Sequence, residues 1–187
     1  MKYENLTSDQ YYHVYNRGNN YENLFKENRN YIFFLDLMKR HLLEVTEILC
    51  YCLLKNHFHL LIKTKENCTD SEISQKFSNF FNSYSKAINR AHKRNGSLFK
   101  DRFSRKKIES EDYLKELIIY IHLNPTHHGF TDEFSTYPHS SFKSLISTKK
   151  TLLAREFVLE LFDSNENFQY SHKTKIPELD EEITFEQ

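Results

Sequence analysis

Two histidines separated by one residue stand near the middle of an apolar run at residues 51–63. Successive side chains of a β-strand point to opposite faces, so a strand here places His57 and His59 on one face and Phe58 on the other. Two imidazoles on one face can converge on a single metal ion while the other face packs on a core. The spacing alone leaves open a second interpretation, in which both are hydrogen-bonded histidines of a half-exposed strand.

A tyrosine and an asparagine four residues apart form the second chemical feature. Tyr120 and Asn124 lie in an apolar segment that Ser110 is expected to cap, and on a helix the two share one face. A tyrosine with an ordinary pKa near ~10 is ionised in only about one molecule in a thousand at neutral pH, so as a nucleophile it needs a metal ion or a base beside it. By composition alone, Tyr120 is one of twelve tyrosines, most of which serve packing.

Five segments of the chain resemble, in order, the HUH single-tyrosine transposases, and most closely the branch of REP-associated tyrosine transposases. The segments are YHVYNRG at residues 12–18, LKNHFHLL at 54–61, GSLFKDRF at 96–103, YIHLNP at 120–125 and YPHSS at 137–141. Five ordered segments are far more specific than a single pair of histidines. The resemblance covers residues 10–146.

The resemblance implies a ferredoxin-like fold and a set of site residues. Tyr120 would attack a DNA phosphate to form a 5′-phosphotyrosine intermediate, through which single-stranded or hairpin DNA is cut and rejoined. His57, His59 and Asn124 would hold a divalent metal ion, and such nitrogen and oxygen donors suit Mg²⁺ or Mn²⁺. Metal binding should weaken below about pH 6, because protonated imidazole cannot ligate. Tyr113, on nearly the same helix face, is the alternative nucleophile.

Charge is unevenly distributed along a chain whose net charge is zero. Residues 84–107 carry nine basic side chains and one acidic one, or +8, whereas the residues after Leu159 carry eight acidic and two basic ones, or −6. The basic stretch precedes the tyrosine segment, which predicts contacts with DNA phosphates. The candidate DNA-binding residues are Arg17, Arg102, Arg105, Lys106 and Lys107. The interleaved Phe99, Phe103 and Tyr84 can stack on unpaired bases or be buried in the core.

Hydrophobic periodicity predicts the elements that must position these residues. It predicts strands at 11–17, 46–54, 57–63 and 99–108 and helices at 30–45, 71–94 and beyond Ser110. In the helix at 30–45, Ile32, Leu35 and Met38 are expected on the apolar stripe. The order predicts an α+β fold with a ferredoxin-like antiparallel sheet and the tyrosine-bearing helix packed near the histidine strand.

The five segments that resemble the transposase family also divide the chain into a domain and an extension. We expect a transposase domain at residues 1–146 and an acidic C-terminal extension of unknown role at residues 147–187. Four further histidines are assigned no catalytic role. They are His13, His122, His127 and His128, of which His122 faces away from Tyr120 and the last two follow Pro125, where a helix is expected to fray.

The sequence also permits other functions, although it restricts their number. A signal sequence and an apolar run long enough for a membrane span are both lacking, and three cysteines form no disulfide framework, so we expect a cytoplasmic protein. Cys50, Cys52 and His59 offer an alternative zinc set, and His139 begins an H-x-S motif like those of two-histidine phosphoesterases. A DNA-binding module that no longer cuts is a further alternative. Whether the protein works as a monomer or a homodimer is left open.

Overall fold

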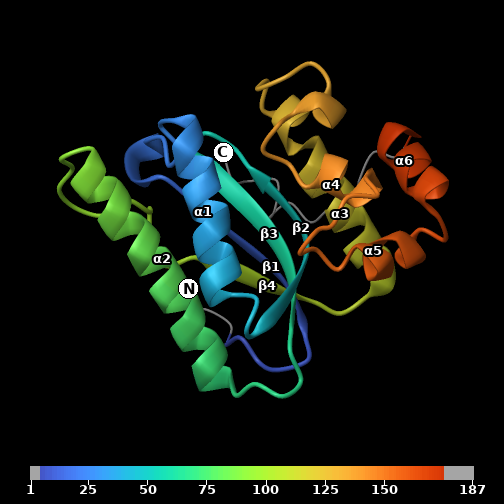
Figure 1. The fold of residues 1–187 in the computed structure, drawn as a ribbon, viewed down its shortest axis with the longest axis horizontal. Helices are drawn as coiled ribbons and strands as arrows, with labels where there is room; N and C mark the ends of the chain where they lie inside the picture. Colours follow the sequence, from blue (N-terminus) through green and yellow to red (C-terminus); the bar gives the residue numbers. More distant parts are fainter. Residues whose placement is uncertain (1–4, 175–187) are drawn as a thin grey trace.

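One antiparallel sheet organises the computed structural model, which describes residues 5–174. Its strands are β1 (Tyr11–Arg17), β2 (Thr46–Leu53), β3 (His57–Thr64) and β4 (Ser104–Ile108), in the spatial order β2-β3-β1-β4. Helices α1 (Asn28–His41) and α2 (Asp70–Ala91) connect them in the chain order β1-α1-β2-β3-α2-β4. This is the ferredoxin-like arrangement, so the predicted α+β fold is confirmed (Figure 1).

The first core lies between the sheet and helices α1 and α2. Val14, Phe58 and Leu60, which alternate along β1 and β3, point into it and are fully buried. Aromatic rings fill the space above them: Phe34 of α1 makes edge contacts with Phe80 and Tyr84 of α2, with ring centroids 4.8 and 5.0 Å apart. Offset and edge contacts of this kind add to the burial of apolar area in fixing the two helices on this face.

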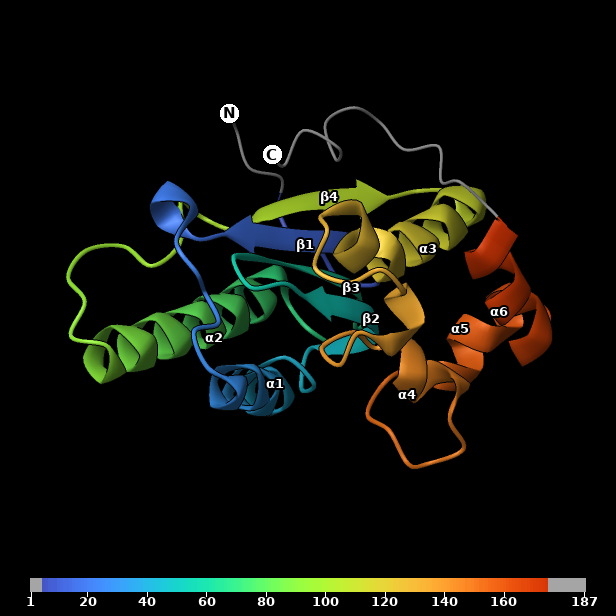
Figure 2. The same ribbon diagram turned by 90° about the horizontal axis from the view of Figure 1, so that it is seen from above.

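A second core lies on the opposite face, under α3 (Glu111–His127). Ser110 caps this helix as expected, because its hydroxyl accepts a hydrogen bond from the Tyr113 amide at 3.1 Å. Shorter elements surround α3 on its far side (Figure 2). They are the 3₁₀ turn η2 (Phe134–Thr136), which adjoins α3, and the helices α4 (Phe142–Ile146), α5 (Arg155–Leu161) and α6 (Asn165–Thr174). A further 3₁₀ turn, η1 (Asn19–Tyr21), follows β1 at the other end of the sheet. No helix in the described residues is long and apolar enough to cross a membrane.

Three local predictions differ from the structure. Ile32, expected on the buried stripe of α1, is 57% exposed and Leu35 is half-buried, whereas Met38 is buried as expected. Tyr31 and Phe34 are buried in place of Ile32 and Leu35, because the aromatic side chains of the helix meet Phe25 and the sheet. Strand β4 begins at Ser104 rather than at residue 99, since Phe99 makes only an isolated bridge to Gly18.

The third difference is the end of α3, which continues past Pro125 to His127. Proline removes one backbone donor, but the turn beyond it is closed by a hydrogen bond from the His128 amide to the Asn124 carbonyl at 3.0 Å. His128 is therefore the ordered C-cap of the helix instead of part of a frayed end.

Helices α5 and α6 belong to the second core. Val158, Phe162 and Phe168 are buried with the apolar residues of α3, and a chain of polar contacts crosses the same core. His122 of α3 lies 2.9 Å from the ring nitrogen of His172 in α6 and 2.8 Å from the hydroxyl of Ser141. Residues 147–174 thus brace α3 from behind. Residues 175–187, which carry five of the eight acidic side chains after Leu159, lie outside the described residues.

The buried imidazole pair predicts a loss of stability in mild acid. Burial lowers the pKa of His172 to about 4, whereas an unfolded histidine titrates near 6.5, so protons favour the unfolded chain as the pH falls below 6.5. This one group should lower the free energy of unfolding by about 2 kcal/mol between pH 7 and pH 5.

Urea unfolding at the two pH values measures this effect. The His172→Gln variant should be less stable than the parent at pH 7 but should lose about 2 kcal/mol less on acidification. Parallel pH dependences of the two proteins would show that His172 is not held neutral.

Candidate active site

The two histidines of β3 and the tyrosine helix meet on one face of the sheet. The Nε2 atom of His57 lies 3.4 Å from the side-chain oxygen of Asn124, and the ring of His59 meets that of Tyr120 edge to face, with centroids 5.8 Å apart. Tyr120 is 7% exposed and Asn124 is fully buried. One chain therefore brings together all four residues that the sequence singled out as nucleophile and metal ligands.

His57 is held in place by the turn that precedes it. Its Nδ1 atom lies 2.9 Å from the side-chain oxygen of Asn56, while the Asn56 carbonyl accepts a hydrogen bond from the Gly18 amide at 2.8 Å. Gly18 is required at this place, because a Cβ atom there would lie 1.9 Å from the Glu22 carbonyl oxygen. The turn and the end of β1 thus form one unit, which leaves the Nε2 atom of His57 directed at Asn124.

His59 is held by a histidine that the sequence analysis left without a role. The Nε2 atom of His13 in β1 lies 2.9 Å from the Nδ1 atom of His59, and the two rings are stacked with centroids 5.1 Å apart. When His59 donates through Nδ1 in this hydrogen bond, its Nε2 atom carries the lone pair that a metal ion needs. Outer partners of this kind orient metal-binding histidines in proteins.

Two more side chains approach the same histidines. Tyr15 of β1 stacks on His59 at a centroid distance of 6.1 Å, and His128 meets the ring of His57 at 4.7 Å. Strand parity already placed His13 and Tyr15 on one face of β1. It could not show that β1 pairs with β3 so that Tyr15 stands opposite His59.

The histidines of this cluster are neutral at physiological pH. Burial lowers the pKa of His57 to about 4, with the neighbouring His128 adding to the effect. Burial also lowers the pKa of His13 to about 3, assisted by the charge of Lys106, and it lowers the pKa of His59 well below the ordinary value. Neutral imidazoles keep the lone pairs that bind metal ions.

The donor set fits a divalent cation such as Mn²⁺ or Mg²⁺. Two neutral imidazoles and one amide oxygen converge, and each imidazole has a hydrogen-bonding partner on its second nitrogen. The alternative zinc set finds no support. Cys52 does stand opposite His59 in the sheet, but burial raises the pKa of both Cys50 and Cys52, and no group of three His, Cys, Asp or Glu side chains within residues 5–174 is arranged to hold a metal ion.

The predicted DNA-binding residues are divided between the two faces of the sheet. Arg17 stands opposite His57 and Lys106 opposite His13 on the tyrosine face, whereas Arg105 stands opposite Val14 and points to the other face. Arg102 lies in the loop before β4, close to Arg105, and Lys107 pairs with Glu109 at 3.8 Å. Of the interleaved aromatic residues, Tyr84 and Phe99 are buried in the first core, and Phe103 is half-buried.

Tyr113, the alternative nucleophile, lies two turns away from this cluster. Its hydroxyl is 3.3 Å from the Lys106 ammonium, which also lies 5.0 Å from the centre of its ring. The aromatic contact to His59 comes from Tyr120. The geometry therefore distinguishes two tyrosines that helical spacing could not.

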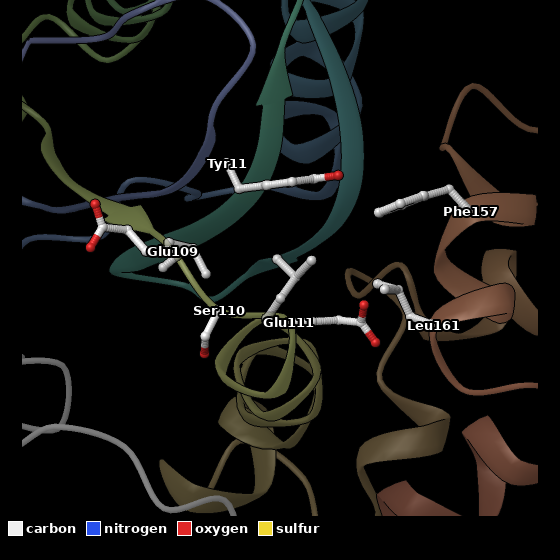
Figure 3. A pocket seen from close by; sticks show the side chains of 8 residues that line it. Tyr11, Glu109, Ser110, Glu111, Phe157 and Leu161 are labelled. Atoms are coloured by element: carbon white, nitrogen blue, oxygen red, sulfur yellow. The ribbon is translucent and has the colours of Figure 1, made fainter.

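A small cavity at the other end of α3 has a different character. It holds about 170 Å³ where the start of β1, the first turn of α3 and helix α5 meet, and Figure 3 shows Glu109 and Glu111 beside it. The rings of Tyr11 and Phe157, which also line it, are stacked with centroids 5.8 Å apart. Both carboxylates are paired with lysines, Glu109 with Lys107 at 3.8 Å and Glu111 with Lys115 at 2.7 Å. The residues that line this cavity include none of the proposed ligands or the proposed nucleophile.

Comparisons with known proteins are informative at the level of three-dimensional structure. No protein-family model matches the chain, and no curated protein is similar to it in sequence. Among solved structures, it is similar to a REP-associated tyrosine transposase bound to a REP hairpin, with a TM-score of 0.63 over 79% of this chain and 85% of that chain. The two sequences are 17% identical, so the likeness shows a shared fold. At that level it agrees with the resemblance seen in the sequence.

The lowered pKa values revise the expected pH dependence of metal binding. With ordinary pKa values near 6.5, loss of two neutral imidazoles would weaken Mn²⁺ binding about 100-fold between pH 7.5 and pH 5.5. Because burial moves the pKa of His57 to about 4 and that of His59 well below 6.5, we expect a change of less than about tenfold. Calorimetric titration with Mn²⁺ at the two pH values measures it.

Three variants identify the ligands in the same titration. His59→Ala and Asn124→Ala should weaken Mn²⁺ binding, whereas His128→Ala, which removes a ring in contact with His57, should not. Equal losses in all three variants would mean that the cluster binds the ion in some other way.

Proposed function

We propose that this chain is a tyrosine transposase that cuts and rejoins single-stranded or hairpin DNA through Tyr120. The observation that carries the proposal is the contact between the Tyr120 ring and His59, next to His57 and Asn124, within one chain. The fold shared with a REP-associated tyrosine transposase supports it. A soluble DNA-acting enzyme of this kind would work in the cytoplasm.

The chemical step proposed for Tyr120 is an in-line displacement at phosphorus. The phenolic oxygen forms a bond to the 5′ phosphate, the bond to the 3′ oxygen breaks, and the proton lost by the phenol is balanced by the one that the 3′ oxygen gains. The partly buried ring, packed against His59, fixes the direction of attack. Strand joining is the reverse reaction, in which a 3′ hydroxyl attacks the phosphotyrosine, so no ATP is needed.

A divalent ion, Mg²⁺ or Mn²⁺, would be held by His57, His59 and Asn124. When bound it would neutralise charge that develops on the phosphate. The hydrogen bonds of His57 to Asn56 and of His59 to His13 keep the two imidazoles oriented for that task.

Positive charge around the site would hold the scissile strand. Arg17 stands opposite His57, and its Nη1 atom is buried without a hydrogen-bonding partner among the described residues, so it suits an anionic oxygen. Lys106 lies on the same face beside His13. A single chain supplies every proposed ligand and the nucleophile, so a homodimer, which stays a prediction, is not required to complete the site.

Formation of a covalent adduct tests the proposal. Incubated with Mn²⁺ and a single strand carrying an inverted repeat from beside its gene, the protein should become attached to the 5′ side of the cut. Tyr120→Phe keeps the ring and its packing but removes the attacking oxygen, so it should retain DNA binding and lose the adduct by at least about 1,000-fold. Denaturing electrophoresis of labelled DNA detects the product.

Tyr113→Phe is the matched control on the same helix. It should form the adduct at close to the parent rate, because Tyr113 contacts Lys106 rather than His59. Loss of the adduct in this variant alone would transfer the role to Tyr113. If neither the parent nor either variant forms an adduct but the protein binds the DNA, the chain is a binding module that does not cut.

A further inference from the structure

A cleft of about 490 Å³ lies on the face of the sheet opposite Tyr120. It is bounded by α2 on one side and by the loop that leads into β4 on the other, and two of the predicted DNA-binding residues, Arg102 and Arg105, line it. Its size is in the range of sites that hold small molecules or single groups of larger ones. The proposed cleavage chemistry makes no use of it.

The cleft exists because β4 begins late. The chain leaves the sheet after the bridge between Phe99 and Gly18 and returns only at Ser104, so the intervening loop stands away from α2. Asn16 of β1 fastens this loop, since its side-chain amide donates to the Asp101 carbonyl at 3.0 Å. Apart from Phe81, the α2 residues that line the cleft have short polar side chains, which leave the space open. They are Ser74, Ser78, Asn82 and Ser85.

A planar stack ends at this cleft. The ring of Phe103 stacks on Phe77 with centroids 5.3 Å apart, and the guanidinium of Arg105 lies 4.7 Å from the centre of the Phe103 ring. A guanidinium supported in this way presents a flat, positively charged surface on which nucleic-acid bases stack. The short hydroxyl and amide side chains of α2 face it across the cleft and can bond to the edge of a base.

The charges around the cleft also suit a nucleotide. Among the described residues that line the cleft, Arg102 and Arg105 contribute two positive charges, against one carboxylate from Asp101. The Oδ1 atom of Asp101 accepts a hydrogen bond from the Arg102 amide at 2.7 Å. The net positive charge favours a phosphate at the rim, while the planar stack favours an aromatic ring inside. A base and its phosphate supply both groups at once.

We propose that this cleft binds one unpaired nucleotide of the DNA that is cut at Tyr120. The inference rests on the proposed function, because it takes the ligand to be DNA. The base stacks on the Arg105 guanidinium, and Asn82 contacts its edge. Since β4 is the outer strand of the sheet, with Lys106 on one face and Arg105 on the other, the DNA passes around this edge and is held on both faces.

Two asparagines on α2 provide a matched test. Asn82 lines the cleft and Asn79 does not, both are exposed, and each takes part in one side-chain hydrogen bond along the helix. Asn82→Leu removes a hydrogen-bonding amide from the cleft at nearly the same side-chain size, whereas Asn79→Leu makes the same substitution outside it. The probes are a fluorescent DNA hairpin with single-stranded flanks and the same stem without flanks.

Asn82→Leu should weaken binding of the flanked hairpin about tenfold and leave binding of the blunt stem unchanged, and Asn79→Leu should alter neither. Arg105→Lys keeps the positive charge but removes the planar guanidinium. It should therefore weaken binding of the flanked hairpin while the salt dependence of binding stays the same. Thermal unfolding confirms that each variant is folded.

Replacing the flanking nucleotides one at a time by abasic sites locates the ligand. At one flanking position, the abasic site should weaken binding by the parent protein about tenfold. The same abasic site should not weaken binding by Asn82→Leu any further, because both changes remove the same contact. Equal affinity of Asn82→Leu and the parent, or equal losses on flanked and blunt hairpins, would overturn the inference.

The outcome is separate from that of the cleavage experiment. A protein that forms the Tyr120 adduct but shows no effect of Asn82→Leu keeps its proposed function and loses the nucleotide site. A protein that forms no adduct but binds flanked DNA through this cleft keeps the site as part of a binding module. Failure of the parent protein to bind either hairpin would overturn the nucleotide site together with the proposed DNA substrate.

Discussion

The alternation of side chains along β3 is the constraint on which the rest of the structure depends. Phe58, Leu60 and Ile62 are buried in the core under α1 and α2. Because side chains alternate along the strand, His57 and His59 must then lie on the face covered by α3. A shift of one residue in the pairing with β1 would exchange the two faces and place imidazoles in an aromatic core. Apolar burial on one face thus fixes the position of polar chemistry on the other.

Exclusion of water from that second face sets its electrostatic character. The cost of charging a buried imidazole keeps His13, His57 and His59 neutral, and the positive charges of Lys106 beside His13 and Arg17 beside His57 act in the same direction. Neutral imidazoles and permanent cations have complementary uses, because the first can ligate a metal ion and the second can attract phosphate. Burial therefore keeps the histidines able to bind a metal ion while the cations beside them remain able to attract phosphate.

The tyrosine helix is supported from both sides. Its inner face meets β2 and β3, and its outer face packs against α6 through the buried contact between His122 and His172. A reactive side chain must be held closely to act in line, and a helix braced only by the sheet could tilt. Residues beyond 146 thus contribute to the position of Tyr120 even though they supply no proposed catalytic group.

The sequence by itself determined the features that depend on local periodicity. It placed His57 with His59 and Tyr120 with Asn124, located the capped helix after Ser110, and indicated a ferredoxin-like sheet. Periodicity is a property of residues close together in the sequence, so it can be recognised without knowledge of the fold. It was less reliable for α1, where the aliphatic and aromatic stripes differ by about one residue and only the packing partners select between them.

Only the tertiary structure decided which distant residues meet. The contacts of His13 and Tyr15 with His59 follow from the register of β1 on β3, and that of His128 with His57 follows from the way α3 crosses the sheet. The same is true of which face Arg105 and Lys106 each occupy, because the register of β4 on β1 places them opposite Val14 and His13. The register of the strands and the way α3 crosses the sheet depend on how much apolar surface both cores bury together. That burial involves residues far apart in the sequence, so a local pattern cannot predict it.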